Sequence, residues 1–300
     1  MSPPWERRTW RASQPTVIAM LDAQAWLRGL PTDLAPQRDV IAAFLALARG
    51  DERIRLFVVG CSIGRGAADA LSDVDALLGV REDAWEAALA ESRSWMTRVG
   101  ATVDLWQTLM PGGPPRFRDW QHTFAEFANG VQLDLSMSRA MDRDRPRADW
   151  VVLHDPDGVV RGDPLPRTAA AQDVRDWAYR VLTRLSACAK YLERGALWEA
   201  HGMVELARAD LWRIWCAAES VADPQYGLTA AFDDPRRPVP PGFERTIATL
   251  DPRALQRAAL AALEMFASTW PRAMSAVGEP DAAFPPLASS VRERLRKVAT

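Results

Sequence analysis

Two aspartates one residue apart follow a turn of small residues early in the chain. The stretch GCSIGRGAADALSDVDALLGV, residues 60–80, follows the apolar run Leu56–Val59 and leads through Asp73 and Asp75 into a second apolar segment. Because successive side chains of a strand alternate between faces, we expect both carboxylates on one side of a sheet, about 7 Å apart. Such a pair repels unless a cation lies between its members, and magnesium prefers oxygen ligands of this kind.

The turn before this pair has the features of a phosphate-binding loop. Cys61–Gly66, CSIGRG, follows a predicted strand and is expected to open a short helix. Its glycines allow backbone N–H groups to approach a phosphate, and a helix start adds partial positive charge. The Ser62 hydroxyl can donate a hydrogen bond to a phosphate oxygen. Arg65 either pairs with a phosphate or is a solvated loop residue.

A third carboxylate would complete a two-metal site and could accept a proton from an attacking hydroxyl. Asp134 lies between Leu133 and Leu135 in a predicted strand, so alternation places it on the face opposite to these leucines. We therefore choose Asp134 as the third carboxylate. Asp104 has a similar pattern and is the reserve candidate.

The composition is that of an ordinary globular protein of 300 residues, with 48% hydrophobic and 25% charged residues. The net charge of −2 argues against a nucleic-acid partner. No stretch has the length and apolarity of a membrane span, and the arginine pair near the N-terminus lacks the apolar region of an export signal. Three separated cysteines, Cys61, Cys188 and Cys216, suggest neither disulfides nor a zinc site. We expect a cytoplasmic protein.

The pattern of apolar residues divides the chain into a mixed half and a helical half. The first half predicts an ordered N-terminal extension, helices at 37–50 and 82–99, and strands at 56–59, 74–80, 101–110 and 150–154. Residues 123–138 predict a hairpin whose Asn129-Gly130 pair favours a two-residue type I′ turn. From about Thr168 onward only helical periodicity remains, at 171–220, 251–276 and 288–298.

These patterns predict an α+β fold with two domains. Residues 1–165, including an N-terminal helical extension, are expected to form a mixed β-sheet flanked by helices. Residues 166–300 are expected to form an all-α helical bundle. Trp212 and Trp215 are expected in the core of that bundle.

The opening motif resembles the signature of the DNA polymerase β-like nucleotidyltransferase superfamily. Cys61-Ser62-Ile63-Gly64-Arg65-Gly66 is similar to the Gly-Ser-x-x-x-Gly of that superfamily, with cysteine at the usual glycine position. Ser72-Asp73-Val74-Asp75 is similar to its Ser-Asp-x-Asp. The whole chain is most similar to the aminoglycoside nucleotidyltransferases, in particular the streptomycin 6-adenylyltransferase branch. The segments that carry this likeness, in order, are residues 51–55, 132–136, 152–158 and 189–208.

The resemblance implies transfer of a nucleotide from a nucleoside triphosphate, with ATP expected, to a hydroxyl of a small molecule, using two magnesium ions. It implies that the first domain is the nucleotidyltransferase domain, in which Asp73, Asp75 and Asp134 hold metal and Asp134 is the general base. It further implies that Ser62, Cys61 and Arg65 bind the nucleotide. Lys190 is similar to a helical lysine that reaches the triphosphate, or else is a surface residue at a helix end.

A cationic acceptor would need acidic groups from the second, substrate-binding domain. The candidates on or near a predicted helix at 185–217 are Trp198, Glu199 and Glu205, with Glu193 and Asp210 beside them. Most such residues are otherwise a solvated helix face. Two alternatives stay open, a protein-modifying nucleotidyltransferase of the antitoxin type and a non-catalytic nucleotide-binding protein of the same fold. The oligomeric state stays open as well.

Overall fold

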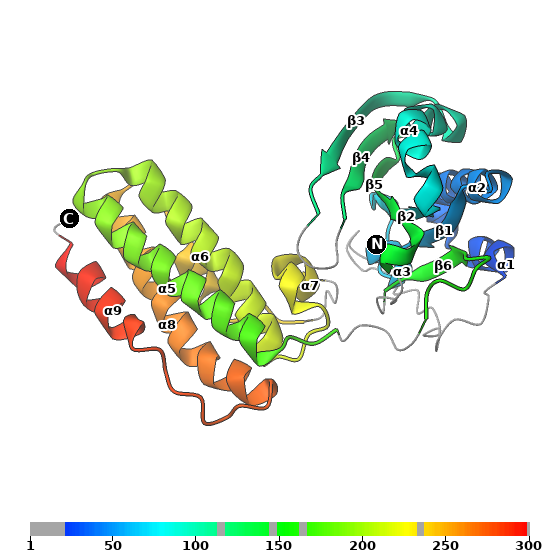
Figure 1. Cartoon of the computed structure of the whole chain (residues 1–300). Helices are drawn as coiled ribbons and strands as arrows, with labels where there is room; N and C mark the ends of the chain where they lie inside the picture. Colours follow the sequence, from blue (N-terminus) through cyan, green and yellow to red (C-terminus); the bar gives the residue numbers. More distant parts are fainter. Residues whose placement is uncertain (1–21, 113–117, 144–148, 162–166, 233–236, 299–300) are drawn as a thin grey trace, which may run out of the picture. The chain divides into compact units, whose positions relative to one another are not determined.

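The computed structural model describes residues 22–112, 118–143, 149–161, 167–232 and 237–298. Within these ranges the fold is α+β, as the sequence predicts (Figure 1). The chain divides into two compact units, residues 1–165 and 166–300. The predicted N-terminal extension lies outside the described residues up to position 21. No described helix combines the length and apolarity needed to cross a membrane.

The first unit is built on a mixed sheet. Its strands are β1 (Ile54–Val59), β2 (Val74–Val80), β3 (Thr102–Met110), β4 (Trp120–Phe127), β5 (Gln132–Arg139) and β6 (Val151–His154). They lie in the order β3-β4-β5-β2-β1-β6. The β2–β5 pair is parallel, and the other neighbours are antiparallel. The described helices of this unit are α1 (Ala23–Gly29), α2 (Ala35–Gly50), α3 (Cys61–Gly64) and α4 (Trp85–Val99).

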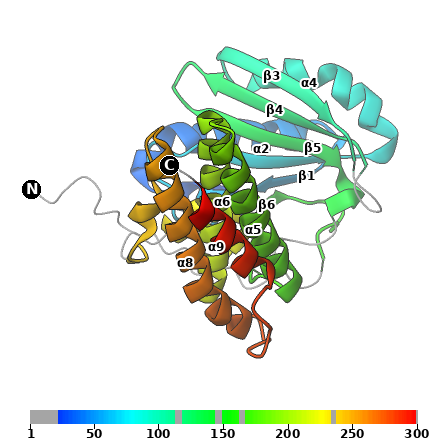
Figure 2. The ribbon, with the colours of Figure 1, turned by 90° about the vertical axis from the view of Figure 1, so that its left-hand side faces the viewer.

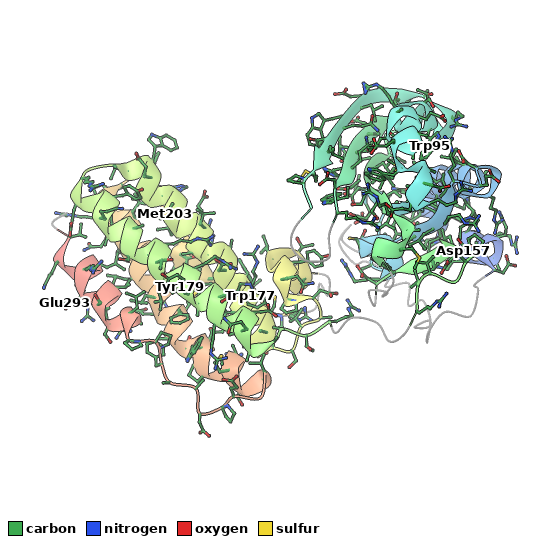
Figure 3. All side chains as sticks on the ribbon, in the orientation of Figure 1. Trp95, Asp157, Trp177, Tyr179, Met203 and Glu293 are labelled. Carbon is green, nitrogen blue, oxygen red and sulfur yellow. The ribbon has the colours of Figure 1, made fainter. Side chains whose placement is uncertain are left out.

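One face of this sheet is covered by α2 and α4 (Figures 1 and 2). Apolar side chains at alternate strand positions, such as Leu133 and Leu135, are buried there with Phe44 of α2 and Trp95 of α4. Trp95 is labelled in Figure 3. Polar residues at the intervening positions of β5 therefore lie on the opposite face. This alternation separates the core side of the sheet from the side that carries the candidate site.

The predicted hairpin forms, but its turn differs from the prediction. β4 and β5 pair antiparallel on either side of the connection Ala128–Gly130, and the Phe127 N–H donates to the Val131 carbonyl at 2.9 Å. Gly130 has φ +83°, whereas Asn129 does not have a positive φ. The type I′ prediction is therefore wrong, since that turn requires two consecutive residues with positive φ. Because the strands close after three loop residues, only the glycine takes the left-handed conformation.

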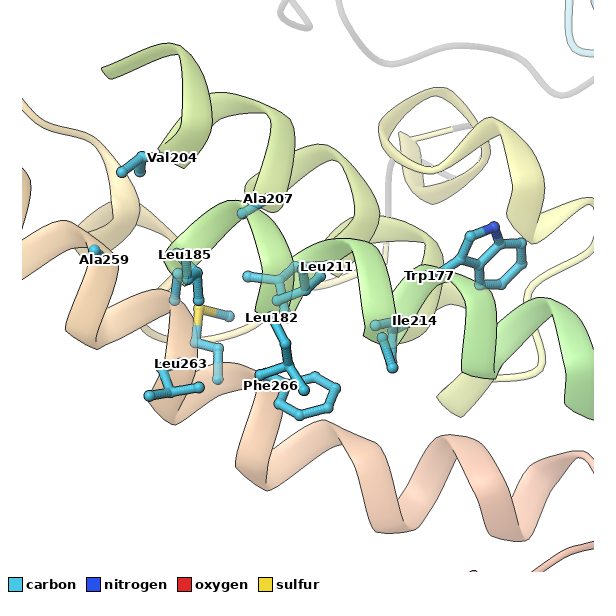
Figure 4. Packing of buried hydrophobic residues seen from close by; sticks show 14 of the residues in the cluster. Trp177, Leu182, Leu185, Val204, Ala207, Leu211, Ile214, Ala259, Leu263 and Phe266 are labelled. Carbon is cyan, nitrogen blue, oxygen red and sulfur yellow. The ribbon is translucent and has the colours of Figure 1, made fainter. Parts of the chain in front are cut away.

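Helices are the only regular elements among the described residues of the second unit. Its helices are α5 (Ala171–Glu193), α6 (Leu197–Ala218), α7 (Leu228–Phe232), α8 (Pro252–Ala276) and α9 (Leu287–Lys297). Leu182 and Leu185 of α5 pack with Leu211 of α6 and with Leu263 and Phe266 of α8 (Figure 4). Trp212 and Trp215 belong to this buried cluster, as predicted.

The predicted continuous helix over 185–217 is wrong. α5 ends at Glu193 and α6 begins at Leu197, with Gly195 between them at φ +68°. A glycine in this left-handed conformation is a common helix terminator because it carries no Cβ. The Gly195 N–H donates to the Leu192 carbonyl at 3.0 Å, which closes the last turn of α5. The break divides one run of helical periodicity into two antiparallel helices, whose apolar faces pack against each other.

Candidate active site

The turn between β1 and β2 is tied to both strands. The Gly60 N–H donates to the Asp75 carbonyl at 3.0 Å, so the end of β1 and the start of β2 hold each other in place. α3 begins at Cys61, whose φ is +50°. This left-handed value is the one that a glycine adopts without cost, and it costs a residue with a Cβ about 1–2 kcal/mol. The cysteine thus accepts the backbone geometry expected of a glycine at this position.

Asp75 and Asp134 are neighbours across the parallel strands β2 and β5. Their Cα atoms are register partners, with Val74 opposite Leu133 and Ala76 opposite Leu135. Adjacent strands lie about 4.8 Å apart, and paired residues of parallel strands project to the same face. The structure therefore brings together two carboxylates that are 59 positions apart in the sequence. Asp104 lies elsewhere, on the edge strand β3 opposite Glu126.

A cavity of about 180 Å³ opens beside this carboxylate pair. Its walls come from the turn, from β1, β2 and β5, and from the segment that leads into β6; they are formed by Val58, Gly60, Cys61, Asp75, Ala76, Leu77, Asp134, Ser136, Asp149 and Trp150. Three of these residues are aspartates. The cavity is thus acidic and lies on the face of the sheet that α2 and α4 leave uncovered.

The cavity changes the acidity of two of its groups. Burial raises the pKa of Asp75 to about 6, and the nearby negative charges of Asp73 and Asp134 add to this effect. The Cys61 thiol donates a hydrogen bond to the Asp75 carboxylate, which partly offsets the rise. Burial, together with the charges of Asp75 and Asp149, raises the pKa of that thiol to about 12. Cys61 is therefore a protonated hydrogen-bond donor at neutral pH rather than a nucleophile.

Asp73 and Ser62 lie next to the cavity without lining it. Asp73 is exposed one residue before β2 and acts on Asp75 through its charge. The Ser62 hydroxyl oxygen is buried and has no hydrogen-bond partner among the described residues. A buried polar atom without a partner is costly, and a ligand can supply the missing hydrogen bond.

Asp149 is a member of the site that the sequence patterns did not reveal. Its side chain is 2% exposed, and its Oδ2 accepts a hydrogen bond from the Cys61 N–H at 3.1 Å. That N–H is therefore already paired in the turn. The guanidinium of Arg65 lies 3.8 Å from the same carboxylate and is 10% exposed, so Arg65 is not a solvated loop residue. Asp149 directly precedes the predicted strand at 150–154, but no local pattern shows that this segment meets the turn, since only the fold brings the two together.

Gly64 shows how closely the turn packs on this segment. A Cβ on Gly64 would lie 2.0 Å from the Asp149 carbonyl oxygen, and a Cβ on Gly60 would lie 3.5 Å from the Trp150 ring. Only glycine fits at position 64, because that oxygen belongs to the backbone and cannot rotate away. The glycines of the motif therefore allow close packing against the segment before β6, in addition to any approach by a phosphate.

A second unforeseen residue is His122 of β4. Its Nε2 lies 2.9 Å from Oδ1 of Asp134. His122 is the register partner of Ser136 on β5, and Ser136 lies two residues from Asp134 on the same face. The imidazole is therefore on the cavity side of the sheet. Alternation along the predicted hairpin could have found it, since residues two apart share a face.

The residues predicted in the helical half lie in the second unit. Lys190 is exposed in the last turn of α5, with its Nζ 4.9 Å from the centre of the Tyr191 ring. Trp198 is 75% exposed at the start of α6, and Glu199 beside it is also exposed. Glu205 is half-exposed and lies 3.5 Å from Arg208. Their contacts with nucleotide or acceptor stay predictions.

Asp210 is not available to an acceptor, contrary to its inclusion among the acidic candidates. Its side chain is fully buried and is bonded by Arg180, Arg184 and Arg213. A carboxylate enclosed by three guanidiniums joins α5 to α6 and has no room for a cationic ligand. The helical periodicity placed Asp210 on α6 but could not show which face was covered.

The carboxylates of the site suit magnesium, which needs few protein ligands, better than a metal that is held by protein side chains alone. Among the described residues, no three His, Cys, Asp or Glu side chains are grouped closely enough to hold a metal ion. Asp75 and Asp134 instead offer a pair of carboxylates beside an open cavity, with the unpartnered Ser62 hydroxyl nearby. Magnesium is usually held by one or two carboxylates together with water and substrate phosphates.

Comparison with solved structures finds similar nucleotidyltransferase structures. An aminoglycoside 6-adenyltransferase from Bacillus subtilis is 18% identical, with a TM-score of 0.39, over 90% of this chain and 99% of that chain. A nucleotidyltransferase-like protein from Exiguobacterium sibiricum 255-15 is 12% identical, with a TM-score of 0.35, over 89% of each chain. The chain is similar to nucleotidyltransferases. No protein-family model and no curated protein matches it.

Proposed function

We propose that this protein is a magnesium-dependent nucleotidyltransferase. In the proposed reaction, a nucleoside monophosphate passes from a nucleoside triphosphate, with ATP expected, to a hydroxyl of a cationic, aminoglycoside-like small molecule. The observation that supports this most is the in-register pair Asp75 and Asp134 beside a cavity next to a glycine-containing turn. Nucleotide transfer needs positioned carboxylates and a site for phosphates more than it needs a protein nucleophile.

The residues have separate roles in this proposal. Asp75 and Asp134, with Asp73 at the rim, would hold magnesium, which supplies charge stabilisation for the phosphates when it is bound. The Ser62 hydroxyl would donate to a phosphate oxygen. The acceptor oxygen attacks the α-phosphorus, the bond from that phosphorus to the bridging oxygen breaks, and pyrophosphate leaves. Asp134 takes the hydroxyl proton.

The acceptor follows from charge. Glu199 and Glu205 of the second unit are exposed or half-exposed carboxylates. They fit the amino groups of a cationic acceptor better than they fit an anionic one. Glu199, Glu205 and Trp198 are therefore proposed to bind the acceptor, and Lys190 of the same unit is proposed to bind the triphosphate.

Release of pyrophosphate by the purified protein tests the proposal. The assay contains magnesium, each nucleoside triphosphate in turn, and a panel of aminoglycosides. Asp134→Asn is expected to lower kcat by about a hundredfold or more, since it removes the proton acceptor. Asp104→Asn is the matched control, because this carboxylate lies on β3 outside the cavity, and it should leave kcat unchanged.

Three outcomes separate the alternatives. Labelling of peptide hydroxyls in place of the drugs would favour the protein-modifying enzyme. Tight nucleotide binding without pyrophosphate release under any condition would favour the non-catalytic protein. Full activity of both Asp75→Asn and Asp134→Asn would contradict the proposal.

A further inference from the structure

His122 and Asp134 form a hydrogen-bonded pair between neighbouring strands. The Nε2–Oδ1 distance of 2.9 Å is that of a normal hydrogen bond. The His122 side chain is 24% exposed, and that of Asp134 is 47% exposed. The carboxylate is therefore open to solvent on one side and held by an imidazole on the other.

The imidazole is itself fixed by aromatic packing. The Trp106 ring of β3 meets it edge-to-face, with centroids 5.6 Å apart at 84°. The Trp120 ring at the start of β4 lies 5.9 Å away at 52°. Two tryptophans from different strands thus pack against His122 and restrict the rotation of its ring.

Asp134 needs such support because of its other neighbour. Asp75 lies beside it in register and carries the same charge when both are ionised. A mobile, half-exposed carboxylate next to a like charge would turn away toward solvent. A hydrogen bond to one of its oxygens holds the carboxylate in place against this repulsion.

We propose that His122 is a positioning residue for Asp134. Its Nε2–H donates to Oδ1 and leaves the other oxygen, Oδ2, to take the proton of the acceptor hydroxyl or to hold magnesium when the metal is bound. His122 neither gains nor loses a proton in the reaction. The inference rests on the proposed function, since it assigns a partner to the proposed base.

Two substitutions separate the hydrogen bond from the packing. His122→Phe keeps a ring between the tryptophans but cannot donate to Asp134. His122→Gln has an amide nitrogen at the position of Nε2 and can donate. We expect His122→Phe to lower kcat by about tenfold to a hundredfold with little change in KM for the nucleotide, and His122→Gln to recover most of the loss. Equal losses in both variants would show a merely structural role and overturn the inference.

Binding of Mn²⁺ alone, measured by electron paramagnetic resonance, provides a readout that does not depend on turnover. Affinity is expected to fall about tenfold in His122→Phe and to be restored in His122→Gln. Asp134→Asn sets the level for loss of the carboxylate itself. If the wild-type protein shows neither Mn²⁺ binding nor turnover, the proposed function fails. If the wild-type protein binds Mn²⁺ or turns over, and His122→Phe does so equally well, only the inference about His122 fails.

The wild-type protein offers a test that needs no folded Phe variant. The chain has only three histidines, so their ring nitrogens can be resolved by ¹⁵N NMR. The inference requires the His122 tautomer with the proton on Nε2 at pH 8, and Asp134→Asn should change that nitrogen's signal. A proton on Nδ1 alone would overturn the inference, because Nε2 could not then donate.

Discussion

Asp75 combines a functional position with a cost to stability. Its pKa of about 6 in the folded protein lies above the ordinary value of 3.8, chiefly because the side chain is partly buried. The folded state therefore binds this proton more tightly than the unfolded state does. The contribution of Asp75 to the free energy of unfolding thus falls as the pH rises from about 4 to about 6, and the cost is complete above that range.

Asp75→Asn should consequently stabilise the protein at pH 8 while removing a predicted metal ligand. We expect a gain of about 1 kcal/mol, which allows for the part of the side chain that solvent reaches, and no gain at pH 4. Thermal unfolding at both pH values measures it. Asp104→Asn, on an exposed carboxylate, should change little at either pH. A variant that is less stable than wild type at pH 8 would contradict the assigned origin of the pKa rise.

Cys61 allows a test of backbone strain. Its φ of +50° favours glycine, and its thiol donates a hydrogen bond to the Asp75 carboxylate. Cys61→Ala removes the thiol and keeps the Cβ, whereas Cys61→Gly removes both. The glycine variant should therefore be more stable than the alanine variant by about 1 kcal/mol in chemical denaturation. Equal stabilities would mean that the turn relaxes out of the left-handed conformation when the thiol is lost.

Among the elements, α5 and α6 are joined by charge as well as by apolar packing. Asp210 of α6 is bonded by Arg180 and Arg184 of α5 and by Arg213 of its own helix. These bonds compensate a carboxylate that is completely removed from water. Removing it would leave three guanidiniums facing one another across the helix pair without their shared anion.

Asp210→Asn should therefore destabilise the second unit by about 3 kcal/mol or more. Glu205→Gln is the matched control on the same helix, because Glu205 is half-exposed and its ion pair with Arg208 is expected to contribute less than about 1 kcal/mol. Urea unfolding followed by circular dichroism measures both. An Asp210→Asn loss no larger than that of the control would show that the guanidiniums are equally well solvated without the carboxylate.

At the scale of the whole molecule, the two units have separate cores. One buried cluster joins the sheet to α1, α2 and α4, and another joins the helices from α5 to α9. Domains with cores of their own commonly unfold in separate steps, and substitutions in distant places act additively. Substitutions at Asp75 and at Asp210 should therefore shift different unfolding transitions in calorimetry.

We expect two calorimetric transitions, with Asp75→Asn moving one and Asp210→Asn moving the other. The double variant should show both shifts unchanged. Mg-ATP should raise the transition that responds to Asp75→Asn, since a ligand of the native state stabilises it by mass action. A single transition moved by both substitutions would show that the units unfold together.

Much of the fold follows from local patterns. The alternation around Asp134 predicted its exposure opposite two buried leucines, and the apolar run 74–80 coincides with β2. The hairpin was predictable, but its turn type was not, because closure of the ladder decides how many loop residues remain. The break at Gly195 was missed, because the apolar period continues on both sides of it.

The sequence by itself determined the succession of strands and helices along the chain and the side of each strand on which a carboxylate falls, because both depend on the period of neighbouring residues. Only the tertiary structure decided which distant residues meet. The parallel pairing of β2 with β5 sets Asp75 beside Asp134, His122 reaches Asp134 across β4, and Asp149 bonds to the Cys61 N–H from the segment before β6. No local pattern encodes these contacts, since each joins residues of different segments that become neighbours only when the sheet is assembled.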